Sequence, residues 1–230
     1  MRFPKILVIT SCTGEKRYKP SNQLTLQDFK NINHLKQRES ELSPFLCSAG
    51  DLYTGKQHIC LMAGIQSLRN IFGSHIIDVK ILSAGYGLIS EDKLIAPYEV
   101  TFNAMKAREI DEWATHLDIH ESVNTSIESY DLIFFLLGDK YLRTLSLPLD
   151  TSSKQTLIFL ASRQKASSIQ GMNAKVFVMP LSNAEAKKYH YGLVGLKGYL
   201  FQRFTKVVIN NHHLLEDVYN APEHFVNLLS

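Results

Sequence analysis

Short apolar runs alternate along this chain with longer segments of helical periodicity, and this order predicts strands separated by helices. The predicted buried strands lie at 2–10 (with 6–9 as the apolar centre), 79–82, 130–137, 157–160 and 176–179. The run YDLIFFLL at 130–137 is apolar on both faces, which is typical of a central parallel strand. The predicted helical segments are 56–72, 104–116, 118–129 and a C-terminal helical part over 184–230.

Strands that alternate with helices favour a single α/β domain over 1–230, folded as a three-layer α/β/α sandwich with a mostly parallel central sheet. The polar, irregular stretch 20–44 is expected to be a flexible excursion with some helix. Polar or glycine-containing loops follow four of the strands, at 11–16, 83–87, 138–141 and 161–163. In a parallel sheet these loops meet at one edge, so we expect a cleft there.

The segment 79–103 is the most informative part of the sequence. Its strand stops in Ser83-Ala84-Gly85-Tyr86-Gly87, where two glycines bracket a tyrosine and indicate a tight turn. A rigid corner, Pro97-Tyr98-Glu99, follows about ten residues later and carries an aromatic ring and a carboxylate. Because ligands bind beyond the carboxyl ends of strands in such sheets, chemistry is expected here first.

Composition narrows the class of protein. The chain has 230 residues, 45% hydrophobic and 20% charged, which is typical of a globular domain. A net charge of +3 gives no strong field, although basic residues gather near 16–19 and 187–206 and permit contact with a polyanion. Three cysteines without C-x-x-C spacing, and no signal peptide or apolar run of about 18 residues, predict a cytoplasmic protein that does not span a membrane. The histidines lack metal-ligand spacing, so no metal is expected.

Several loops could carry chemistry, and each has a structural alternative. The loop SCTGEK at 11–16 could cradle an anion or be an ordinary connection, and Cys12 could be a nucleophile or a packed small residue. Asp51 could act as a general base or cap a helix. The stretch 187–206 suits contact with a nucleic-acid backbone, or packs as an amphipathic helix. The P-loop, G-x-S-x-G, H-E-x-x-H and G-x-G-x-x-G motifs are absent, which disfavours the enzymes that use them.

Three loop tyrosines, Tyr53, Tyr86 and Tyr98, accompany the carboxylates Asp51 and Glu99. Any one of these rings could simply be a core residue with a satisfied hydroxyl. Together they would suit stacking on a planar heterocycle and hydrogen bonding to its edge.

The motifs SCTGEK, AGDLYTG, LSAGYGLISEDKLIAPYEVTF and LLGDKYL, within about 5–145, resemble those of a prokaryotic family with an LSA-x-YGL and PY signature, that of the peroxide-stress protein YaaA and its relatives. The order of strand ends is also similar to the uracil-DNA glycosylase superfamily, with 134–138 and 157–162 as matching strands and 163–168 near the DNA backbone. Bacterial antiviral DNA glycosylases look like the nearest functional analogue.

These resemblances imply a uracil-DNA-glycosylase-like fold and a DNA glycosylase that hydrolyses the N-glycosidic bond of a flipped, modified base, for example in phage DNA, without metal or cofactor. The predicted catalytic residues are Asp51 and Glu99. The predicted base pocket comprises Ser11, Cys12, Tyr53, Ser83, Tyr86, Gly87, Tyr98 and Gly138. The predicted phosphate-binding residues are Thr13, Lys16, Arg163, Lys197 and Arg203. A non-catalytic DNA-binding stress protein and an enzyme acting on free nucleosides or nucleotides remain alternatives.

Overall fold

A six-stranded sheet forms the centre of the computed structural model, which describes residues 3–229. Its strand order is β4-β3-β1-β6-β7-β8, and every neighbouring pair is parallel except β3 and β4. The strands are β1 (Ile6–Ser11), β3 (Ile77–Ser83), β4 (Gly87–Ser90), β6 (Leu132–Leu136), β7 (Thr156–Ser162) and β8 (Lys175–Leu181). The predicted mostly parallel sheet is confirmed.

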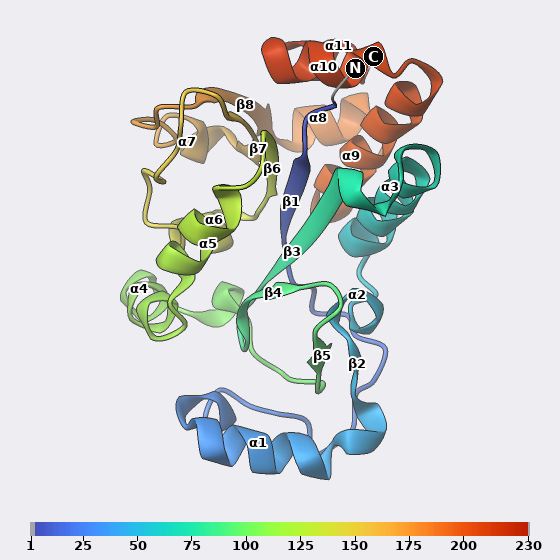
Figure 1. The fold of residues 1–230 in the computed structure, drawn as a ribbon. Coiled ribbons are helices and arrows are strands. Elements are labelled where there is room, and N and C mark those ends of the chain that lie inside the picture. The colour runs from blue at the N-terminus through green and yellow to red at the C-terminus, as the bar shows by residue number, and fades with distance from the viewer. Residues whose placement is uncertain (1–2, 230) are drawn as a thin grey trace.

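Helices cover both faces of this sheet, which confirms the three-layer α/β/α sandwich (Figure 1). On one face α3 (Lys56–Phe72) packs along α9 (Leu193–Asn210), followed by α10 (His213–Asn220) and α11 (His224–Asn227). On the other side lie α4 (Ala107–His116), α5 (Ile119–Ile127) and α6 (Asp139–Arg143). Between β7 and β8 the chain forms α7 (Arg163–Ala166), and α8 (Asn183–Lys188) follows β8.

The core confirms that β6 is a central strand. All five of its residues are buried, because side chains on both of its faces meet other rings. Phe134 packs against Phe201 and Phe204, with ring centroids 5.2 and 5.5 Å away, and Phe135 stacks on Phe159 at 4.3 Å. Aromatic contacts of this kind stabilise a core beyond the area they bury.

Several boundaries differ from the sequence prediction for local reasons. β8 continues through Pro180, which is tolerated because β8 is the edge strand of the sheet. The helical pattern at 184–206 divides into α8 and α9 after His190, whose φ is 51°. The turn at 83–87 folds the chain back into β4, a strand that the sequence did not reveal, through Gly87 at a φ of 71°.

The segment 20–44, expected to be a flexible excursion with some helix, does contain helix, and it packs on the rest of the fold through Leu24, Phe29 and Leu42. It contains a single-turn 3-10 helix (Asp28–Lys30) and α1 (Ile32–Glu41), which lies apart from the sheet at one end of the molecule (Figure 1). Leu24 pairs with the backbone on either side of Tyr98, and the Phe29 ring packs edge-on against Tyr86 and Tyr98. A Cβ on Gly85 would lie 2.6 Å from the Phe29 ring, so the glycine makes room for that ring.

Short elements complete the chain around this segment. A two-stranded antiparallel ribbon joins β2 (Cys47–Ser48) to β5 (Leu94–Ile95), and α2 (Ala49–Leu52) follows β2. The remaining single turns are 3-10 helices at Ser43–Phe45, Ser74–Ile76 and Phe102–Ala104.

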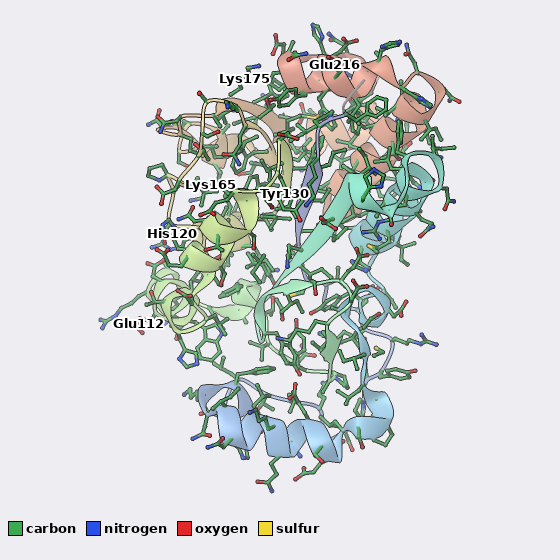
Figure 2. All side chains as sticks on the ribbon, in the orientation of Figure 1. Glu112, His120, Tyr130, Lys165, Lys175 and Glu216 are labelled. Atoms are coloured by element: carbon green, nitrogen blue, oxygen red, sulfur yellow. The ribbon has the colours of Figure 1, made fainter. Side chains whose placement is uncertain are left out.

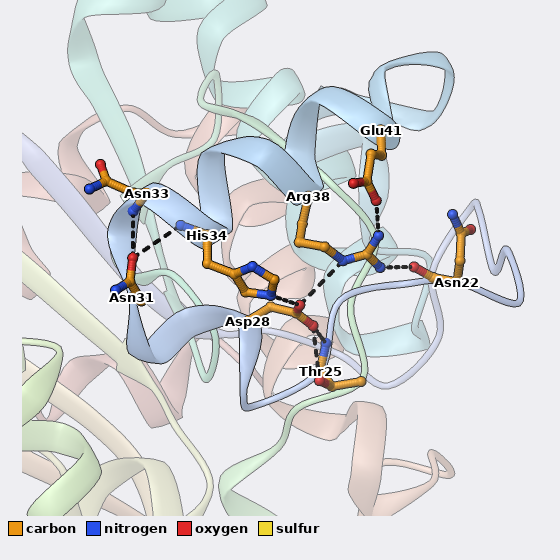
Figure 3. A network of polar contacts seen from close by, with 8 residues as sticks. All are labelled: Asn22, Thr25, Asp28, Asn31, Asn33, His34, Arg38 and Glu41. Carbon is orange, nitrogen blue, oxygen red and sulfur yellow. Dashed lines mark hydrogen bonds and ion pairs between the residues drawn. The ribbon is translucent and has the colours of Figure 1, made fainter.

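Asp28 holds the segment 20–44 together through a polar network (Figure 3). Its carboxylate accepts hydrogen bonds from the backbone and hydroxyl of Thr25 at 2.7 and 2.9 Å. His34 and Arg38 lie 3.0 and 3.3 Å from the same carboxylate. Burial alone would raise the pKa of Asp28, but the hydrogen bonds from Thr25 and His34 and the charge of Arg38 together lower it.

We expect Asp28→Asn to lower the free energy of unfolding at pH 7 by roughly 1–2 kcal/mol, because bonds to a charged acceptor are lost. The folded-state pKa of Asp28 is lowered, so the carboxylate stabilises the fold above its unfolded pKa near 3.8 and loses this effect as pH falls through the folded value. The difference from the wild type should therefore shrink below about pH 4. Urea unfolding of both proteins at pH 7 and pH 3 measures this difference in the free energy of unfolding. Asp217→Asn, at an exposed position, is the control. A pH-independent difference would contradict the role of the charge.

Candidate functional site

A cavity of about 660 Å³ opens where the strand order reverses, between the carboxyl ends of β1 and β6. Open α/β sheets bind ligands at this switch point, because the connecting loops diverge there to opposite faces. Three groups of residues line the cavity: the loop after β1 (11–15 and Lys19), the starts of α3 (55–57) and α9 (Leu193, Val194, Lys197), and Asn103, Gly138 and Tyr141.

Two long helices begin at this cavity. The first N–H groups of a helix have no partner within it and carry the positive end of its dipole, so they attract anions. At the start of α3, the Gly55 N–H donates to Thr13 Oγ1 at 3.3 Å, which fixes the loop after β1 against the helix. A Cβ on Gly55 would lie 2.7 Å from the Thr13 side chain, so only glycine permits this approach. The arrangement suits a phosphate.

Lys197 adds a cation from the first turns of α9. Its side chain is partly buried at the cavity, and burial lowers the pKa of its ammonium group while the nearby Asp139 opposes that shift. Within 3–229 its ammonium forms no hydrogen bond or ion pair with another side chain. A lysine in this situation gains most from an anionic ligand, which would replace the water it has lost. Lys19 and Lys56 also line the cavity.

Gln57 gives the cavity an oriented hydrogen-bond acceptor. Its side-chain amide nitrogen donates to Thr10 Oγ1 at 3.1 Å and to the carbonyl of Leu136 at 3.0 Å. These bonds join the ends of β1 and β6 and use both amide hydrogens. No donor from the described residues contacts the remaining polar atom, Oε1. Gln57 can therefore offer Oε1 to an N–H group of a ligand.

Glu15 supplies the carboxylate among the described residues that line the cavity. Its backbone is fixed, because its carbonyl accepts from Thr13 Oγ1 at 2.9 Å and from the Thr54 N–H at 3.0 Å. Its side chain is exposed and can reach a ligand or a water molecule.

A buried polar network lies beneath the cavity. Ser83 Oγ accepts from the N–H groups of Gly85 and Tyr86, so its own hydrogen is directed to the Tyr98 hydroxyl 2.7 Å away. Tyr98 lies 2.7 Å from the hydroxyl of Tyr53, and burial raises the pKa of both phenols. They remain neutral, so they position the loops and do not act as bases.

A second part of this network reaches the cavity wall. Cys12 Sγ lies 3.2 Å from the Tyr141 hydroxyl, which is 3.3 Å from Thr101 Oγ1. Lys16 is buried with its ammonium 4.5 Å from the centroid of the Tyr98 ring. Burial lowers the pKa of Lys16, while Cys12 and Glu99 oppose that shift.

The structure brings five of the predicted site residues to the cavity: Ser11, Cys12, Thr13, Gly138 and Lys197. Three residues of the predicted base pocket, Tyr53, Ser83 and Tyr98, are at most 2% exposed and do not line the cavity, so they are not placed to stack on a ligand there. Tyr86 is held by the Ala96 N–H and packs on Phe29, and Gly87 lies against Leu117, so neither lines the cavity. These positions build the turn that supports the site.

The predicted carboxylates also lie elsewhere. Asp51 is exposed on α2, where its N–H and carboxylate both bond to the capping Ser48. Glu99 is exposed at a separate hollow of about 790 Å³, lined partly by Trp113 and His116. Neither residue lines the switch-point cavity.

Three of the predicted phosphate contacts are displaced from the cavity. Lys16 is buried, Arg163 pairs with Glu185 at 3.2 Å, and the Arg203 guanidinium lies 6.0 Å from the Tyr189 ring centroid. Sequence reasoning missed lining residues that the structure adds: Glu15, Lys19, Lys56, Gln57, Asn103 and Tyr141. Glu15 belongs to the loop 11–16, which the sequence already indicated as a possible anion site, so its place in that loop could have predicted that it lines the cavity. Gln57 gave none, since its role depends on contacts with two distant strands.

The fold and this cavity define a three-layer α/β protein with a cavity at the switch point of its sheet. The chain belongs to a family of unknown function, DUF6884, whose model matches residues 38–174. No curated protein matches the chain. The matched region supplies the start of α3, Asn103 and α6, whereas the loop after β1 and α9 lie outside it.

Two further findings concern the chemistry available over 3–229. None of the helices there combines the length and the apolar character needed to cross a bilayer. Over the same residues, no three His, Cys, Asp or Glu side chains converge in a way that could hold a metal ion.

Proposed function

We propose that this chain is a DNA glycosylase that takes one nucleotide into the switch-point cavity and hydrolyses its N-glycosidic bond. The observation that carries the proposal is the pairing of an anion site with an oriented amide acceptor. The starts of α3 and α9 and Lys197 suit a phosphate, and Gln57 Oε1 suits a base N–H group. A nucleotide presents both groups.

The size of the cavity is sufficient for a nucleotide. Ligand pockets commonly enclose about 300–1,000 Å³, and this cavity, at about 660 Å³, lies well inside that range. Similarity of the sequence motifs to the YaaA family, and of the strand ends to uracil-DNA glycosylases, supports the same reaction. The biological setting we propose is defence against phage whose DNA bears modified bases.

The reaction requires a water molecule, a positively charged sugar and a departing base. The bond between C1′ and the base nitrogen breaks, and its electron pair leaves with the base while C1′ gains oxocarbenium character. Water attacks C1′ and gives a proton to the Glu15 carboxylate, whose negative charge also stabilises the sugar. The departing base nitrogen takes a proton from solvent, and the protonated Glu15 then returns its proton to solvent, so the reaction consumes one water molecule in total.

An enzyme acting on free nucleotides is the second candidate, because Arg163 and Arg203 lie away from the cavity. Arg163 is paired with Glu185, and the net charge of the chain is only +3. A free nucleotide would need the phosphate site at α3 and α9 and no further basic surface.

The test compares DNA substrates with matched mononucleotides. Unmodified DNA, DNA carrying hypermodified phage bases and the corresponding nucleoside monophosphates are incubated with the protein. Released base is identified by mass spectrometry, and abasic sites are detected by alkali cleavage. We expect base release from one modified DNA. Release only from mononucleotides would favour the second candidate, and DNA binding without release from any substrate would indicate a binding protein.

A further inference from the structure

A second hollow, of about 360 Å³, borders the cavity across α6 and the segment 103–105. We call it the α6 groove; it is lined by Ala104, Met105, Lys106, Ala107, Ile110, Asp139, Lys140, Arg143 and Lys165. Gly138 lines the cavity, and the next residue, Asp139, lines the groove. In the same way, Asn103 lines the cavity and Ala104 lines the groove. Consecutive Cα atoms are about 3.8 Å apart, so the two hollows are adjoining parts of one surface.

The groove is basic. Four cationic side chains, Lys106, Lys140, Arg143 and Lys165, line it together with one carboxylate, that of Asp139. Asp139 already accepts a hydrogen bond from Ser162 Oγ at 2.9 Å. A surface with this excess of positive charge attracts an anion.

Two of these cations are already used within the fold. The Lys140 ammonium donates to the carbonyls of Asn103 and Met105 at 2.9 and 2.7 Å, which fixes the wall between cavity and groove. Arg143 forms an ion pair with Asp111 through two hydrogen bonds, at 2.7 and 2.5 Å. These two residues shape the groove: Lys140 keeps its positive charge, because it bonds neutral carbonyls, whereas Asp111 offsets the charge of Arg143.

Lys106 and Lys165 remain available. No side chain or carbonyl of the described residues pairs with either ammonium group, and Figure 2 shows Lys165 beside α6. Lys106 is exposed at the start of α4, and Lys165 is half-buried on α7. They approach the groove from different elements, so an anion between them would be held from two sides.

We propose that the α6 groove binds the backbone phosphates of a single DNA strand that flank the nucleotide in the cavity. This inference rests on the proposed function and deepens it, since it assigns the strand contacts to Lys106 and Lys165 in place of Arg163 and Arg203. Lysine acts as a point charge without base-edge geometry, so the groove positions the strand and carries no sequence preference. Because the groove is assigned to the flanking phosphates alone, we expect binding of a mononucleotide in the cavity not to depend on it.

The test measures binding of a fluorescein-labelled ten-nucleotide thymidine strand at several salt concentrations, using wild type and Lys106→Gln/Lys165→Gln. For single strands the slope of log K against log salt is about −0.7 per phosphate contact, so losing two contacts should make it shallower by about 1.4. Affinity at low salt should fall by about tenfold or more. Lys36→Gln/Lys206→Gln removes the same charge from exposed sites on α1 and α9 and should leave the slope unchanged. Thermal unfolding verifies the fold of each variant, and thymidine monophosphate should bind all three proteins equally.

An unchanged slope in the groove variant, or an equal loss in the control variant, would overturn the groove assignment even if base release from DNA is observed. Salt-independent or undetectable binding of the strand to wild type would overturn it too. If the slope changes as expected but no base is released from any substrate, the groove assignment stands and the proposed reaction fails.

Discussion

Gly198→Ala should lower the free energy of unfolding by about 3 kcal/mol and abolish binding of a mononucleotide in the switch-point cavity. A Cβ at this position would lie 2.0 Å from the carbonyl oxygen of Gln57 and 2.8 Å from its carbonyl carbon. Both atoms belong to the backbone of α3, so no side-chain rotation relieves the overlap. Alanine normally gains up to about 1 kcal/mol over glycine inside a helix, but the clash between two packed helices is the larger effect.

The consequence for ligand binding follows from the neighbours of Gly198. Gln57 is the residue that Gly198 touches, and Lys197 precedes it, so separating α3 from α9 displaces the amide acceptor and the ammonium together. Urea unfolding and mononucleotide binding measure the two effects. Gly192→Ala is the matched control, because a Cβ there meets nothing within 4 Å. Equal stability of the two variants would show that α9 can shift without cost, contrary to the packing described here.

Much of the fold was predictable from the sequence, because its signals are local. Runs such as 130–137 and 157–160 are too apolar to lie anywhere but in a sheet covered on both faces, and the helix 56–72 ends at Gly73 as its pattern indicates. The exceptions depended on context. The low strand propensity of proline predicts that the strand ends before Pro180, yet β8 continues through it. This is tolerated because β8 is an edge strand, so the sheet loses no hydrogen bond where proline lacks an N–H group.

The site was less predictable, because burial is decided by tertiary contacts. The tyrosines of the LSA-x-YGL and PY motifs gave a strong sequence signal, and the structure uses Tyr98 as a buried support bonded to Ser83. Conversely, Gln57 lies in an ordinary helical pattern and becomes an oriented acceptor only because Thr10 and Leu136 come together below it. Of the four predicted strand-end loops, those at 11–16 and 138–141 contribute lining residues to the cavity, whereas those at 83–87 and 161–163 do not. Residue types alone did not predict the polar groups of the cavity, such as Gln57.

Glu15 is the carboxylate that we propose takes a proton from the attacking water. Glu15→Gln should therefore slow base release by about 10²–10⁴-fold while leaving DNA affinity unchanged. Glutamine keeps the shape of the side chain, but it cannot take a proton from water or offer a negative charge to the sugar. The loss should therefore appear in kcat and not in KM. Single-turnover release of base from the modified DNA, with binding of the same DNA measured separately, distinguishes the two quantities.

Three matched variants make this result decisive. Glu128→Gln, at the exposed residue that follows α5, removes one carboxylate that does not line the cavity and should retain the wild-type rate. Asp51→Asn and Glu99→Gln test the carboxylates that the sequence favoured and the geometry does not. If Glu99→Gln abolishes release and Glu15→Gln does not, the reacting sugar must lie toward the hollow beside Trp113 and not at the switch point. Loss confined to Glu15→Gln would place the reaction at the ends of β1 and β6, beside the proposed phosphate and base contacts.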